Sequence, residues 1–135
     1  MKFRTKKNPY TILIVDDEKT VIDTLSTVLD IRGFNILEAN NGNKAWELIN
    51  RHKPDLIILD LMIPGVNGLE ICTRIKSDKH LSKIPVLIIT VITKDSELPD
   101  GFWCKGTGAN DFVTKPFDPF SLADKVERLL KVNNP

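Results

Sequence analysis

The amino-acid sequence predicts an α/β domain in which a parallel sheet is covered by helices on both faces. Five short apolar runs rich in Ile and Val alternate with segments of helical periodicity, which is the pattern of repeated strand–helix–strand units. Three of the five runs are apolar on both faces, as buried parallel strands are. The 135 residues suffice for one domain with its own core. We therefore expect a doubly wound sheet with right-handed crossovers.

The predicted strands are short segments that end next to polar residues. They cover residues 11–15, 34–39, 56–59, 86–89 and 111–114. In a parallel sheet all strands end at one edge, and ligands bind in the crevice outside that edge. The residues that follow these runs are therefore the first candidates for a functional site.

The first and last predicted helices have the clearest sequence signals. The apolar residues of the first are Val21, Ile22, Leu25, Val28 and Leu29. Their spacing is helical, and Gly33 follows them where a left-handed cap ends a helix. The last helix begins after the capping residue Asp118, with Pro119 at its first position. Shorter helices are expected around Ala45 to Ile49 and after Asn67.

Composition excludes several classes of protein. The formal net charge is +1 and 27% of the residues are charged, so we expect neither direct nucleic-acid binding nor attraction to a membrane. No apolar run approaches the roughly 18 residues of a membrane span. Two cysteines are too few for a disulfide framework, so we expect a reducing, cytoplasmic setting. Residues 1–9 are interpreted as a basic N-terminal arm.

Polar side chains follow four of the five predicted strands. Asp16 and Asp17 come directly after the first, Asp60 after the third, Thr90 after the fourth and Lys115 after the fifth. Three carboxylates at one edge repel one another unless a cation compensates, and Mg²⁺ prefers such oxygen ligands. A lysine and a hydroxyl nearby suit the oxygens of a phosphoryl group. The pattern therefore indicates a site for phosphoryl chemistry.

Four segments, taken in order, resemble a known family. They are ILIVDDE, DLIILDLMIPGVNGLE, IPVLIIT and ANDFVTKPFDPFSL. Together they resemble the receiver domain of two-component response regulators, and we place this domain at residues 10–132. The resemblance implies a flavodoxin-like sheet of five strands in the order 2-1-3-4-5.

The resemblance also assigns chemical roles to the edge residues. It makes Asp60 the phosphoacceptor and Lys115 the counter-charge of the phosphoryl group. It gives the Mg²⁺ ligands as Asp16, Asp17, Asp60 and the backbone carbonyl of Met62.

Two further residues form a switch by the same resemblance. The hydroxyl of Thr90 would move toward the phosphoryl group, and the aromatic ring of Phe112 would follow it. A cis peptide bond is expected between Lys115 and Pro116, since cis bonds are nearly confined to X-Pro.

The implied function is that of a phosphoryl-accepting signalling domain, not of an enzyme beyond its own phosphorylation and autodephosphorylation. Asp60 would attack a phosphohistidine of a sensor histidine kinase or a histidine phosphotransfer protein. The added charge would bias a two-state surface that a downstream protein reads. The chain would act as a monomer or as a phosphorylation-dependent dimer.

Two departures from the family pattern leave other functions open. Val91 stands where receivers usually carry a small residue, and residues 94–108 contain Pro99 and three glycines where a fourth helix is due. We expect an irregular helix there, with the pair Phe102 and Trp103 as either a partner-binding anchor or a plug for the core.

One alternative function is therefore a docking module that signals without phosphorylation. Another is a phosphatase with an aspartyl nucleophile. Such an enzyme carries a second acid two residues after the nucleophile, where this chain has Met62.

Overall fold

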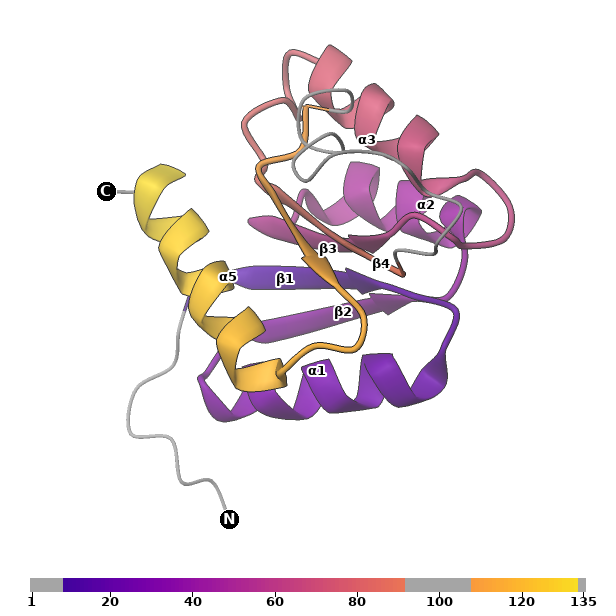
Figure 1. The fold of residues 1–135 in the computed structure, drawn as a ribbon. Coiled ribbons are helices and arrows are strands. Elements are labelled where there is room, and N and C mark those ends of the chain that lie inside the picture. The colour runs from indigo at the N-terminus through magenta and orange to yellow at the C-terminus, as the bar shows by residue number, and fades with distance from the viewer. Residues whose placement is uncertain (1–8, 92–107, 134–135) are drawn as a thin grey trace.

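A five-stranded parallel sheet forms the centre of the computed structural model, which describes residues 9–91 and 108–133 (Figure 1). The strands are β1 (Thr11–Val15), β2 (Asn35–Ala39), β3 (Leu56–Asp60), β4 (Val86–Thr90) and β5 (Asp111–Thr114). They pair in parallel in the order β2-β1-β3-β4-β5. The predicted fold class and strand order are confirmed.

Helices cover both faces of this sheet. The structure describes α1 (Lys19–Ile31), α2 (Gly42–His52), α3 (Gly68–Ser77) and α5 (Pro119–Asn133). One face packs against α1 and α5, the other against α2 and α3 (Figure 1). No helix in the described ranges is long and apolar enough to cross a bilayer. Residues 1–8 of the predicted basic arm and most of the predicted irregular helix, with Phe102 and Trp103, lie outside the described residues.

Helix ends follow the signals in the sequence. Asp118 Oδ1 accepts a hydrogen bond of 3.1 Å from the Phe120 amide at the start of α5, as expected of a capping carboxylate. Asn67 caps α3 in the same way, at 2.8 Å from the Glu70 amide. After α1, Gly33 has a φ of +93°, a conformation that a residue with a Cβ rarely adopts. These ends fix where each helix returns the chain to the sheet.

The sheet separates two apolar clusters and leaves almost no polar group inside. Every residue of β3 and β4 is buried, which explains why their sequences are apolar on both faces. Among the described residues, the buried polar or charged side chains are those of Asp16, Asp60 and Thr90. All three lie at the carboxyl ends of strands, so the interior is apolar except at this edge.

Lys76 joins three segments at the opposite end of the sheet. Its Nζ donates to the carbonyl oxygens of Ser82 and Ile84, at 3.2 and 2.8 Å, and to Oδ1 of Asn110 at 3.0 Å. Burial lowers the pKa of this lysine. The same Asn110 oxygen accepts the Val86 amide at 2.9 Å. Lys76 thus ties the end of α3 to the segments that enter β4 and β5.

We predict that Lys76→Met lowers the free energy of unfolding by about 1–2 kcal/mol, because the apolar stem is kept while the hydrogen bonds of a charged donor are lost. Urea denaturation measures this difference. Lys83→Met, at an exposed position between α3 and β4, is the matched control and should change stability by less than about 0.5 kcal/mol. Equal stability of the two variants would show that the Lys76 contacts contribute nothing net.

Candidate functional site

The polar residues predicted at the carboxyl edge of the sheet come together in the structure. Nζ of Lys115 lies 2.9 Å from Oδ2 of Asp16 and 2.9 Å from Oδ2 of Asp60. The backbone amide of Lys115 donates to the carbonyl of Thr90 at 2.8 Å. One lysine therefore links the ends of β1, β3, β4 and β5.

Each buried carboxylate is held by a backbone amide as well as by the lysine. Asp60 Oδ1 accepts from the Met62 amide, and Asp16 Oδ1 accepts from the Glu18 amide, both at 2.9 Å. Asp16 Oδ2 is buried and accepts no hydrogen bond from the described residues, so its 2.9 Å contact with Lys115 is an ion pair without hydrogen-bond geometry. Among the described residues this oxygen therefore has an ionic partner but accepts no hydrogen bond.

Burial and the ion pairs with Lys115 act in opposite directions on the pKa values at this site. Asp16 is fully buried and Asp60 is 3% exposed. Burial raises the pKa of Asp16, against the lowering effects of Lys115 and the Glu18 amide, and the charge of Asp60 raises it further. Burial alone would lower the pKa of Lys115, but its contacts with Asp16 and Asp60 outweigh burial and raise it. The lysine is charged, and the carboxylates compete for it.

The acidic edge fits a hard divalent cation. Carboxylate oxygens of Asp16, Asp17 and Glu18 lie within 4.8 Å of one another, and hard cations prefer such oxygen ligands. Oδ2 of Asp16 is buried and accepts no hydrogen bond from the described residues, so it has coordination capacity that a cation would use. Asp60 lies outside this group of three and is joined to it through Lys115. Glu18 was not among the predicted ligands, although a third acid directly after the Asp pair was visible in the sequence.

Of the remaining predicted residues, Thr90 lies at this edge, whereas Phe112 pairs with Ile88 two residues further into the sheet. Thr90 is 3% exposed at the end of β4, and Phe112 on β5 is partly buried against the cluster under α2 and α3. Met62 and Val91 are 73% and 52% exposed, so apolar side chains flank Asp60 and Thr90 at the surface. The Lys115–Pro116 peptide bond is cis, as predicted.

The loop after Asp60 is fixed against the start of α2. The Gly42 amide donates to the carbonyl of Pro64 at 2.9 Å, and the Val66 amide donates to Asn43 Oδ1 at 3.2 Å. A Cβ at Gly42 would collide with the Val66 carbonyl, so only glycine allows this approach. These contacts hold the backbone that follows Asp60.

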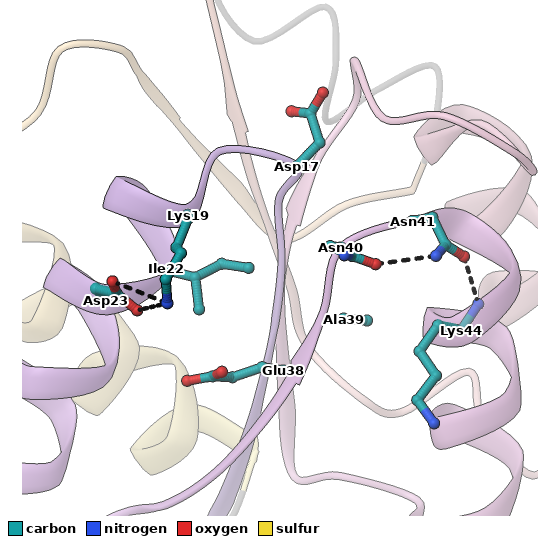
Figure 2. Close-up of a pocket in the computed structure, with 9 residues that line it drawn as sticks. All are labelled: Asp17, Lys19, Ile22, Asp23, Glu38, Ala39, Asn40, Asn41 and Lys44. Atoms are coloured by element: carbon teal, nitrogen blue, oxygen red, sulfur yellow. Dashed lines mark hydrogen bonds and ion pairs between the residues drawn. The ribbon is translucent and has the colours of Figure 1, made fainter.

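A polar cavity of about 450 Å³ lies beside the site, between α1 and α2 (Figure 2). Asp17 lies at the edge of this cavity. Other polar groups that line it form contacts with residues close to them in the chain. Asn41 Oδ1 accepts the Lys44 amide at 2.8 Å, and Lys19 pairs with Asp23 at 3.3 Å. The cavity therefore flanks the acidic edge without including Lys115 or Asp60.

We predict that Asp16→Asn raises the free energy of unfolding at pH 7 by about 1 kcal/mol, because it removes a buried negative charge whose pKa burial has raised. A folded-state pKa above the unfolded value means that the native wild type binds the proton more tightly, so its stability falls as pH rises through that window. The gain of the variant should therefore shrink from pH 7 toward pH 4. Urea denaturation at several pH values measures it, and a gain independent of pH would contradict the electrostatic explanation.

Comparison with known proteins identifies relatives along almost the whole chain. The family model "Response regulator receiver domain" matches residues 12–127. The chain is 37% identical over 125 residues to the phosphate regulon transcriptional regulatory protein PhoB of Pseudomonas aeruginosa, covering 93% of this chain and 53% of PhoB. It is 39% identical over 119 residues to protein PilH of the same organism, covering 88% of this chain and 96% of PilH. The chain thus spans about half the length of PhoB but nearly all of PilH.

Solved structures show the same fold. The signal receiver domain of a signal transduction histidine kinase from Syntrophus aciditrophicus superposes with a TM-score of 0.81 at 33% identity, covering 90% of each chain. The family match, the strand order and the lysine that joins two buried carboxylates at the strand ends agree with one another. The chain belongs to the response regulator receiver family of two-component signalling systems.

Proposed function

We propose that this chain accepts a phosphoryl group on Asp60. The observation that carries the proposal is a single carboxylate that is almost buried, 3% exposed, yet lies at the ligand-binding edge of the sheet 2.9 Å from a lysine ammonium. Receiver domains act with histidine kinases or histidine phosphotransfer proteins. A phosphohistidine of such a protein is therefore the proposed donor.

The proposed reaction is a transfer between two side chains. An oxygen of the Asp60 carboxylate forms a bond to phosphorus while the P–N bond of the phosphohistidine breaks, and the bonding electrons return to the imidazole nitrogen. The product is an acyl phosphate. Lys115 already contacts Asp60 Oδ2, so its charge is in place for the phosphoryl oxygens. Water would later attack phosphorus, breaking its bond to the Asp60 oxygen, so that inorganic phosphate leaves and the carboxylate is regenerated.

We assign Asp16, Asp17, Asp60 and the backbone carbonyl of Met62 as the residues that would hold Mg²⁺. Oδ2 of Asp16 supports this assignment, because it is buried and accepts no hydrogen bond from the described residues. When bound, Mg²⁺ would supply positive charge next to the oxygens of the transferring group. Without it, one lysine alone faces the carboxylates and an incoming anion.

The proposed switch runs along the ends of β4 and β5. Thr90 and Lys115 are linked through the backbone, and Thr90 is paired in register with Thr114 on β5. A hydroxyl that turns toward the phosphoryl group would let Phe112 move with it. A downstream protein, or a second copy of the chain, would read this change in a cytoplasmic setting.

We predict that a small acyl phosphate donor with Mg²⁺ adds one phosphoryl group to the protein, and that Asp60→Asn abolishes the adduct because the nucleophilic oxygen is lost. Intact-mass spectrometry measures it. Asp55→Asn, at an acid remote from this edge whose Oδ2 accepts the Thr11 amide, is a control that should still be modified. No adduct on folded wild-type protein would favour the docking module, and continued release of inorganic phosphate from a phosphomonoester would favour the phosphatase.

We predict that Thr90→Ala is still phosphorylated but does not transmit the change to β5, because the hydroxyl is needed after the transfer and not for it. The measurement is the change of the Phe112 amide resonance in ¹H–¹⁵N spectra on addition of the acyl phosphate donor and Mg²⁺. Thr114→Ala, at the exposed partner position on β5, is the matched control and should respond as wild type does. A wild-type response from Thr90→Ala would remove Thr90 from the switch.

A further inference from the structure

Glu18 occupies the N-cap position of α1 without capping it. Its side chain accepts no hydrogen bond from the first turn, and glutamate is not among the preferred N-cap residues. The backbone of Glu18 is nevertheless fixed, because its amide donates to Asp16 Oδ1 at 2.9 Å and its carbonyl accepts the amides of Val21 and Ile22. The carboxylate instead faces the site, with Oε1 3.4 Å from Nζ of Lys115.

Lys115 and a cation compete for the same oxygens. Its ammonium lies 2.9 Å from Oδ2 of both Asp16 and Asp60, the two buried carboxylates to which the proposed function assigns a divalent cation. A cation that takes these oxygens displaces the ammonium. Because the lysine side chain is only 10% exposed, leaving it without an anionic partner would be costly.

We propose that Glu18 is a positioning residue that receives the Lys115 ammonium when a divalent cation occupies Asp16 and Asp60. The inference deepens the proposed function and rests on it. Glu18 is already in contact with the ammonium, and its side chain is 56% exposed at the rim. Glu18 and Lys115 both line a cavity of about 500 Å³, so the ammonium can shift outward without repacking the core. There it stays within reach of a phosphoryl group on Asp60.

In this mechanism Glu18 raises the affinity of the site for the cation by binding the displaced ammonium of Lys115. The alternative is a direct action, in which Glu18 attracts the cation as the third acid of the group with Asp16 and Asp17. The two mechanisms differ in one respect. An action through Lys115 disappears when the lysine is replaced, whereas a direct attraction remains.

The test is a double-mutant cycle read as Mg²⁺ affinity. Isothermal titration calorimetry with Mg²⁺ alone is performed on the full chain as wild type, Glu18→Gln, Lys115→Gln and the double variant. Glu18→Gln should weaken Mg²⁺ binding about two- to fivefold, the range of an exposed ion pair. In the Lys115→Gln background the same change should have no effect. Glu70→Gln, at an exposed glutamate paired with Arg74 on α3, is the control and should bind as wild type does.

Three outcomes would overturn the proposal. Equal loss of affinity in both backgrounds would show that Glu18 acts on the cation directly. If wild type binds Mg²⁺ and Glu18→Gln binds it with the same affinity, Glu18 has no role in cation binding. That result would leave the assignment of Asp60 as phosphoacceptor unaffected. Wild-type protein that binds no Mg²⁺ would remove the metal assignment itself, and the role of Glu18 with it.

Discussion

The structure depends on one electrostatic constraint: a parallel sheet brings its strand ends to a single edge, and here that edge carries two buried carboxylates with one lysine between them. Removing a charge from water is costly unless a partner compensates. Lys115 supplies that partner while its backbone amide binds the carbonyl of Thr90. Four strand ends are thus held by a residue whose own placement depends on the same acids.

The surrounding contacts keep this cluster rigid on one side and open on the other. The loop after Asp60 is fixed against α2 through Gly42 and Asn43, and α1 starts from a backbone fixed to Asp16. By contrast, Asp17 and Glu18 are exposed. The buried acids therefore have fixed positions. The side chains that can rearrange are those of the exposed acids and of Lys115, which lies between the buried and the exposed acids.

Features that strand topology and helix capping determine could be predicted from the sequence. Polar contacts between segments far apart in the chain could not. Asp16, Asp60, Thr90 and Lys115 were found because each follows an apolar strand, and the end of a parallel strand has a known location.

Lys76 looks in sequence like an ordinary exposed lysine of a helix, since its acceptors at Ile84 and Asn110 belong to other segments. The sequence gives no signal for the ion pairs of Arg32 either, because its partners Asp124 and Glu127, at 2.8 Å each, lie on α5. Glu18 had a sequence signal, but its lysine partner follows a distant strand.

The raised pKa of Asp16 and the proposed switch have the same physical origin. Burial makes negative charge unfavourable at this edge. A cation bound here would therefore stabilise the protein more than a cation bound to a solvated cluster of acids, because charges interact more strongly where water is excluded. Phosphorylation would then replace one carboxylate charge by roughly two phosphoryl charges at pH 7. Once Asp60 carried the phosphoryl group, the ammonium of Lys115 would face phosphoryl oxygens in place of the present Asp60 carboxylate. Since the Lys115 amide donates to the Thr90 carbonyl, the proposed change in the partners of Lys115 would occur at the junction of β4 and β5.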